Sequence, residues 1–347
     1  MTIRGITAAI IAALLLALAA PPALAASGQP FLETPGLTID FVTNPLLMCH
    51  YYLRGYGEVS VKPAGSLDID FNSEATAYGQ AQRYIENPAV WRWIDETIAG
   101  IGDIAGLRKA AADLPAAYRS EEARSGVNLV VDALESGCPN YMKSVYPTEL
   151  AGINRVLVGA KKRFLVGRDR IFGALAKQMA FEPIARPIRV FVVVRTGGVA
   201  SWGATGEFYF TVIGSYGQSP LSLLETGIHE ATHIADALQS FRSEAILGRV
   251  RQGTDGAVRG DVDAFLHGLV AFNAGELVKR FLSQSYTHVG VQAPGVIQTY
   301  KPYLSTYEYI WTAYMDGRMK PDAVVAKLIE EFNAVRKLQG GPTESAP

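Results

Sequence analysis

The chain lacks an excess of charge of either sign, because 32 Lys and Arg residues stand against 33 Asp and Glu residues in 347. No basic surplus suggests a nucleic-acid partner, and no acidic run suggests a disordered tail. After the N-terminal segment there is no apolar stretch long enough to span a bilayer, and there is no internal repeat. What is left is an ordinary globular composition with 49% hydrophobic residues, enough for a substantial core.

The one long apolar run lies at the N-terminus. Arg4 precedes an apolar run over residues 6–20, and small residues follow at Ala23 and Ala25. This layout is typical of a secretory signal peptide over residues 1–25. We therefore expect an exported protein, periplasmic or secreted. An uncleaved N-terminal anchor is the alternative, which two prolines before the cleavage site disfavour.

Cysteine is nearly absent, with only Cys49 and Cys138 in the chain. In an oxidising compartment a single disulfide between them is the expected arrangement. Two unpaired buried thiols are the alternative, because the sequence does not show whether the two Cα atoms come within reach.

The segment patterns predict a mainly helical α+β protein with a small mixed or antiparallel sheet. Residues 37–71 read as strands or irregular segments, and residues 74–179 as helices broken at Pro88, Pro115, Pro139 and Pro147. The longest predicted helix covers residues 148–179. We expect an N-terminal mainly helical region over residues 26–180.

A second region follows over residues 181–337, and a flexible tail over 338–347. Its β-branched runs at 188–195 and 207–214 predict two strands that lead directly into a helix. Further helices are predicted over 261–281, 303–315 and 321–335. We expect the sheet to pack on the helix that directly follows the two strands, in a zincin-like arrangement.

Histidine is also scarce, and two of the five histidines fall in the sequence HEATH at residues 229–233. Helix-start signals at Ser219 and Pro220, and an apolar stripe at three- and four-residue steps, place this motif inside a helix. On a helix, His229 and His233 lie one above the other and can bind one Zn²⁺, with Glu230 beside the open position. A core helix with two hydrogen-bonded histidines is the alternative.

A catalytic zinc normally has three protein ligands. The metzincin continuation HExxHxxGxxH is excluded, because its last two positions hold Asp236 and Gln239. With a strand in front of the motif and a glutamate on a helix behind it, the stretch 188–281 resembles the gluzincin branch of zinc metallopeptidases. This resemblance implies a glutamate as the third ligand.

Glu276 is the glutamate we expect to bind the metal, since on a helix over 261–281 it shares a face with apolar side chains. The alternative is an ordinary surface pairing with Lys279 and Arg280. Arg280 stands where several gluzincins have an aspartate. His267 is the second candidate for the third ligand, nine residues away and so on the opposite face of the helix.

Other residues are candidates for supporting roles. Asp236 is a candidate partner for a ligand imidazole. Tyr286, His288, Tyr303 and Tyr307 are candidates for a donor to a developing oxyanion, although packing is the more common role of any one tyrosine.

Together the patterns predict an enzyme, a zinc metallohydrolase with one Zn²⁺. It would hydrolyse peptide or other amide bonds by Zn-activated water, with Glu230 as the general base. The expected partner is a peptide or protein substrate. The alternative is a non-catalytic exported binding or scaffold protein on a zincin-like fold.

Overall fold

The computed structural model describes residues 39–58, 71–182, 184–196, 201–215, 217–239, 242, 244–254, 257–289 and 301–339. These residues divide into two compact units. The first contains Thr43–Lys143, and the second combines the short segment before Thr43 with Ser144 and everything after it. The predicted signal peptide lies outside the described residues, and so does most of the predicted C-terminal tail.

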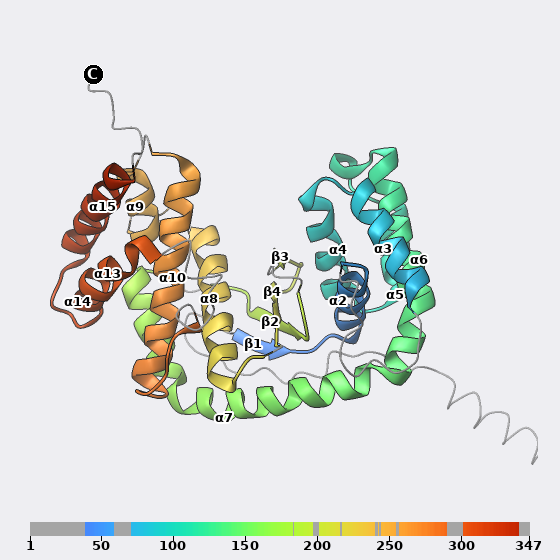
Figure 1. Ribbon diagram of the computed structural model, residues 1–347, viewed down its shortest axis with the longest axis horizontal. Coiled ribbons are helices and arrows are strands. Elements are labelled where there is room, and N and C mark those ends of the chain that lie inside the picture. Colours follow the sequence, from blue (N-terminus) through green and yellow to red (C-terminus); the bar gives the residue numbers. More distant parts are fainter. Residues whose placement is uncertain are drawn as a thin grey trace, which may run out of the picture. The chain divides into compact units, whose positions relative to one another are not determined.

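The first unit is entirely helical in its described residues (Figure 1). Its elements are α2 (Pro45–Glu58), α3 (Asn72–Tyr84), α4 (Pro88–Ile101), α5 (Ile104–Ala112), a 3-10 turn (Ala116–Tyr118) and α6 (Glu121–Ser144). Local chemistry explains several boundaries. The side chain of Asn87 accepts a hydrogen bond from Ala89 N at the start of α4, and Gly102, with φ of 77°, ends that helix.

A disulfide between Cys49 on α2 and Cys138 on α6 crosslinks this unit. The two Cα atoms are 5.8 Å apart, which is an ordinary separation for a bridged pair, and the predicted pairing is therefore confirmed. Both cysteines are buried. The bridge closes a long loop, since Cys49 and Cys138 are 89 positions apart in the sequence.

A buried polar cluster lies beside the disulfide helix. His50 is fully buried on α2, where its Nδ1 lies 2.9 Å from the Tyr78 hydroxyl and its Nε2 lies 3.4 Å from Asp95 Oδ1. Burial and the charge of Arg54 lower the pKa of His50 to about 3, so that this imidazole is neutral. Because none of these groups reaches solvent, the cluster serves packing within the unit.

The second unit contains a four-stranded mixed sheet in the order β1-β2-β4-β3. The strands are β1 (Ile39–Val42), β2 (Ile188–Val193), β3 (Ser201–Ala204) and β4 (Tyr209–Gly214). β1, β2 and β4 are parallel, with Ile188 opposite Ile39 on one side and Tyr209 on the other. β3 pairs antiparallel with β4 and forms one edge. The central strands β2 and β4 are rich in buried Val, Ile and Phe, which is typical of parallel strands.

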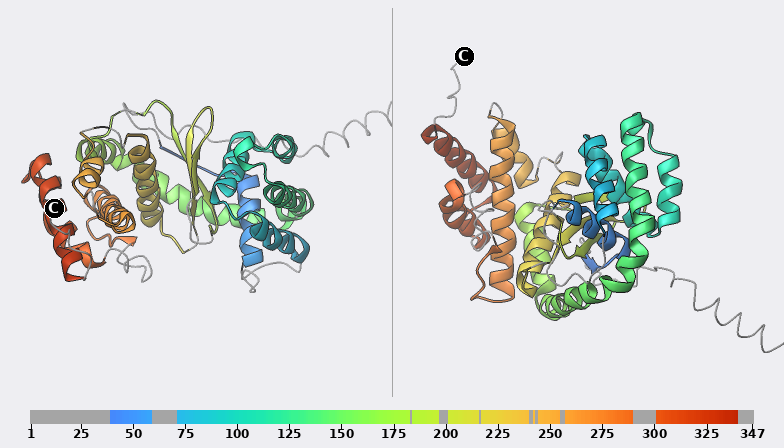
Figure 2. Two further views of the ribbon diagram at one scale, coloured as in Figure 1. Left: turned by 90° about the horizontal axis from the view of Figure 1, so that it is seen from above. Right: turned by 45° about the vertical axis from the view of Figure 1, so that its right-hand side comes forward.

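The other described elements of this unit are helices. They are α7 (Tyr146–Met179), α8 (Pro220–Gln239), α9 (Ile246–Gly253) and α10 (Arg259–Phe281), followed by short turns over Lys301–Met315 and by α15 (Pro321–Leu338). The elements of this C-terminal segment are a 3-10 turn (Lys301–Tyr303), α13 (Leu304–Thr306), a π turn (Tyr307–Trp311) and α14 (Thr312–Met315). Figure 2 shows α8 between the sheet and α10, with α15 beyond α10.

The contact between α8 and the sheet is close at one point. A Cβ on Gly227 of α8 would lie 2.4 Å from Cζ of Phe41, a buried residue of β1. Only glycine therefore fits at this position without displacement of the ring. The position is two residues before His229, so this close approach fixes the distance of the motif from the sheet.

The predicted fold class is confirmed, because the chain is mainly helical with a small mixed sheet that contacts α8. The long helix predicted over 148–179 and the strands predicted at 188–195 and 207–214 are present as α7, β2 and β4. The helices predicted over 261–281 and 321–335 are also present, as α10 and α15. Among the described residues, no helix combines the length and the apolar character needed to cross a membrane.

Three expectations need correction. Residues 45–58 form a helix, because the Asn44 side chain caps the backbone N–H groups of Leu46 and Leu47 at 2.9 and 3.0 Å. Pro139 lies inside α6, where buried residues on both sides continue the helix. The division between the units falls after Lys143 and not at residue 180, because α7 packs against α8 and α10.

Removal of the disulfide should destabilise the first unit. The double variant Cys49→Ala/Cys138→Ala should lose about 4 kcal/mol of unfolding free energy, because an unfolded chain without this crosslink gains the entropy of a loop of that length. Chemical denaturation followed by circular dichroism measures the shift. Reduction of the wild-type protein should produce the same shift, and an unfolding curve that does not respond to reductant would contradict the pairing.

Candidate metal centre

The helix that carries the HEATH motif begins with a reciprocal cap. Ser219 N–H donates to Ser222 Oγ at 2.7 Å, and Ser222 N–H donates to Ser219 Oγ at 3.1 Å. Pro220 follows at the first helical position, where its missing N–H costs nothing. The apolar residues Leu224, Ile228, Ala231 and Ala235 are buried. The motif therefore lies centrally on α8, as the sequence predicts.

Three imidazoles converge at this helix. His229 and His233 come from successive turns of α8, and their Nε2 atoms are 3.0 Å apart. His267 comes from α10, and its ring centroid lies 4.7 Å from that of His229 and 4.9 Å from that of His233. One nitrogen from each of the three rings lies within 4.8 Å of the others, so that the group can hold a metal ion.

The protonation of the three rings suits this role. Burial and the two neighbouring histidines lower the pKa of His229 well below its ordinary value. Burial, His267 and Arg251 lower the pKa of His233 to about 3, and burial lowers the pKa of His267, which is the most exposed of the three. Neutral imidazoles carry the lone pairs that a metal ion requires.

Glu230 lies directly beside these rings. Its Oε1 is 3.8 Å from Nε2 of His229, and its side chain is 14% exposed. Burial raises the pKa of Glu230 to about 7. A carboxyl group with this pKa exchanges protons readily near neutral pH, which is the property of a general base or acid.

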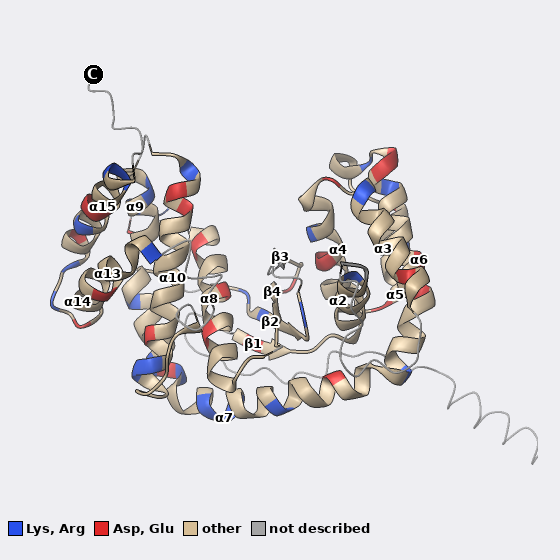
Figure 3. Cartoon of the chain, viewed as in Figure 1, with Lys and Arg blue, Asp and Glu red and all other residues tan. Residues whose placement is uncertain are grey.

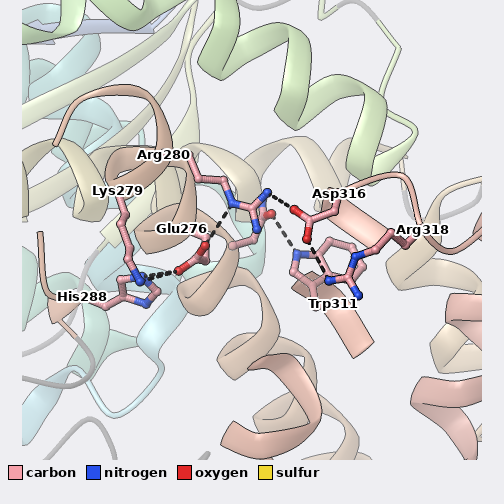
Figure 4. Close-up of polar contacts among 8 residues, drawn as sticks. Glu276, Lys279, Arg280, His288, Trp311, Asp316 and Arg318 are labelled. Carbon is pink, nitrogen blue, oxygen red and sulfur yellow. Dashed lines mark hydrogen bonds and ion pairs between the residues drawn. The ribbon is translucent and has the colours of Figure 1, made fainter. Parts of the chain in front are cut away.

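Glu276 does not belong to this group, and the expectation that it supplies the third ligand is corrected. Figure 4 shows its carboxylate among three basic side chains. His288 Nε2 lies 3.1 Å away, Arg280 Nε 3.0 Å and Lys279 Nζ 3.5 Å. Although burial opposes it, hydrogen bonds from His288 and Arg280 lower the pKa of Glu276 to about 2. The charge of this carboxylate is thus already compensated without a metal.

The geometry of α10 explains why His267 takes the place of Glu276. Nine residues turn an ideal helix through two and a half turns, so the two side chains point to opposite sides. In the structure, the side of α10 that carries His267 faces α8. Sequence periodicity did not distinguish the two sides, because α10 lies between α8 and the C-terminal helices and is buried almost all round.

The candidates for supporting roles lie in several places. Asp236 is buried and pairs with both terminal nitrogens of Arg251, at 3.1 and 2.5 Å. The partner of the Asp236 carboxylate is therefore an arginine. Arg251 comes from α9, a helix that the sequence patterns do not predict, and its positive charge helps to keep His233 neutral.

The aromatic candidates belong to neighbouring contacts. Tyr303 is buried, with its ring 4.8 Å from that of Phe265, and the Tyr307 hydroxyl donates to Phe265 O at 2.7 Å. His288 binds Glu276, as described above. Burial and the nearby Glu225 raise the pKa of Tyr286. None of these four side chains belongs to the group of three histidines.

Comparisons with models of protein families, with curated proteins and with solved structures find no match for the chain. The account of the site therefore depends on its own geometry.

The two candidates for the third ligand are separated by a pair of variants. His267→Ala should lower the affinity for Zn²⁺ by more than the ~10–100-fold that loss of an outer-shell partner costs. Glu276→Gln should leave the affinity within a few-fold of wild type, because its carboxylate lies in a different cluster. Competition titration with a chromogenic chelator measures both affinities. The reverse order of effects would restore Glu276 as the ligand.

Proposed function

We propose that this protein is an exported zinc-dependent hydrolase that cleaves peptide or other amide bonds, and that His229, His233 and His267 bind the zinc. The observation that carries the proposal is the convergence of three imidazoles beside the largely buried carboxyl group of Glu230. Neither feature alone is decisive. Their combination is what a metal-dependent hydrolase requires.

The donor set fits zinc. Zn²⁺ binds imidazole nitrogen at about 2.0–2.1 Å in tetrahedral geometry, which places ligand nitrogens roughly 3.3 Å apart. The His229 and His233 nitrogens are already 3.0 Å apart, and all three ligand atoms lie within 4.8 Å. Three protein ligands leave a fourth position open, as in catalytic zinc sites.

When bound, zinc lowers the pKa of a coordinated water to about 7 and polarises a carbonyl group. The chain supplies the rest of the chemistry. Glu230 accepts a proton from the attacking water and passes it to the leaving amine. Its burial keeps competing solvent away from the transferred proton. A purely structural metal site has no need of such a base, which favours an enzyme over a scaffold protein.

The position of the sheet supports an extended substrate. β3 is an edge strand, and β4 beside it contacts α8. An edge strand presents backbone N–H and C=O groups that can pair with an extended peptide. We therefore propose a peptide or protein as the substrate. Export of the protein is part of the proposal and depends on the signal-peptide pattern at residues 1–25.

The substitution Glu230→Gln tests the mechanism. It preserves the shape of the side chain and removes the base, so that turnover should fall about 10²–10⁴-fold while zinc remains bound. The measurement is cleavage of a broad peptide library by the zinc-loaded mature protein, with product detection by mass spectrometry.

The matched control is Glu308→Gln, in the same unit. Glu308 is exposed and lies outside the group of three histidines. Turnover by this variant should stay close to wild type. A zinc-loaded wild type that cleaves no peptide would favour the scaffold alternative, and full activity of Glu230→Gln would refute the role of this residue.

A further inference from the structure

The outer side of α7 differs from the solvent-facing side of an ordinary helix. The inner side is buried against the rest of its unit through Ile153, Leu157, Ala160, Phe164, Gly167, Ile171 and Leu175. On the outer side, Val158, Leu165 and Val166 are 65%, 60% and 74% exposed. Single exposed aliphatic residues are common on protein surfaces, but three on one stretch of a helix call for an explanation.

The same helix is strongly basic. It carries seven Lys and Arg residues against two Asp and Glu residues, a net charge of +5, in a chain whose total is −1. Figure 3 shows the basic positions distributed along α7. One of the two acidic residues, Asp169, lies 2.7 Å from Arg168 and is paired with it. The positive charge of α7 is therefore concentrated and poorly compensated on the helix itself.

The aliphatic and basic residues share one face. At 100° per residue, positions 155, 158, 162, 165 and 166 fall within an arc of about 100° and extend over roughly 17 Å of the helix axis. We call this surface the α7 outer face, formed by Arg155, Val158, Lys162, Leu165 and Val166, with Arg163 beside it. Arg155, Lys162 and Arg163 are exposed, and their side chains make no ion pair with any residue that the structure describes.

The chemistry of this face fits one kind of partner best. Basic side chains near an anionic lipid surface gain electrostatic attraction, and aliphatic side chains between them can enter the boundary of the acyl region. The long stems of lysine and arginine allow their charges to stay with the headgroups. The side of a single helix is convex and offers no pocket, so it suits a broad deformable surface better than a compact ligand.

We propose that the α7 outer face docks this protein on an anionic membrane surface. The proposal concerns the second unit alone and does not depend on the hydrolase activity. Docking is peripheral and reversible, because it uses one helix face and a few cationic side chains.

Vesicle binding by the full mature chain tests the proposal. The probes are vesicles of phosphatidylglycerol mixed with phosphatidylcholine, and vesicles of phosphatidylcholine alone, in a sedimentation assay. Wild type should bind the anionic vesicles and not the zwitterionic ones, and binding should weaken as salt is raised. The triple variant Arg155→Gln/Lys162→Gln/Arg163→Gln should bind about 100-fold more weakly, at about fivefold for each cationic side chain.

Two further variants separate charge from apolar contact. Val158→Ser/Leu165→Ser/Val166→Ser keeps the charge and should also weaken binding, because the aliphatic contact is lost. Arg83→Gln/Lys109→Gln/Arg124→Gln removes the same charge from exposed positions of the first unit, and should bind nearly as wild type does. Circular dichroism of each variant checks that the fold is retained.

Several results would overturn the proposal. They are an absence of binding by wild type, equal binding to both kinds of vesicle, and equal losses in the α7 charge variant and the first-unit control. Binding to soluble polyglutamate that is unaffected by the serine variant would favour an acidic protein partner instead. Self-association in sedimentation equilibrium that the serine variant abolishes would show that a second copy of the chain covers this face.

Discussion

The packing of α8 against α10 is the contact on which the proposed site depends. Two of the three histidines lie on α8 and are brought together by the helix alone, since four residues separate them. The third comes from α10, 34 positions after His233, and reaches the pair only because these two helices lie side by side. A shift of one helix along the other by a single turn, about 5.4 Å, would separate the rings beyond the reach of one ion.

Contacts on two sides of α8 fix its position. On the side of the sheet, Gly227 allows the ring of Phe41 to approach the helix backbone. This contact sets the distance between the HEATH motif and the sheet. At its N-terminal half, the Val289 N–H is shared between the two carboxylate oxygens of Glu225, and on α10 Glu276 binds His288, one residue earlier in the same loop. The loop that contains both residues therefore ties α8 to α10. Glu276, expected to bind the metal, instead belongs to the contacts that hold the two helices together.

The sequence predicts the local parts of this arrangement well. The HEATH spacing, the cap at Ser219 and the apolar stripe of α8 are short-range features, and the structure contains all three. The choice between Glu276 and His267 depended on which side of α10 faces α8, a long-range property that a helix buried on several sides does not reveal. In the sequence, Arg280 is the residue that indicates a role for Glu276 other than metal binding. A cation one turn after Glu276 is suited to neutralising that carboxylate, and the structure shows this pairing.

The helix α9 was missed because it is short, with eight residues that follow no clear start signal. This omission concealed Arg251, and with it the partner of Asp236. Tertiary burial therefore decides the structure of α9. The glycine and proline residues of 45–58 favour irregular structure, but the local cap at Asn44 starts a helix there.

The most direct test of the proposed centre is a crystal structure of the zinc-loaded mature protein with anomalous scattering recorded at the zinc absorption edge. The account predicts one peak, about 2.0–2.1 Å from a nitrogen of His229, of His233 and of His267, with Glu230 beside the remaining position. A peak bound by the Glu276 carboxylate, or no peak at the three histidines, would contradict it.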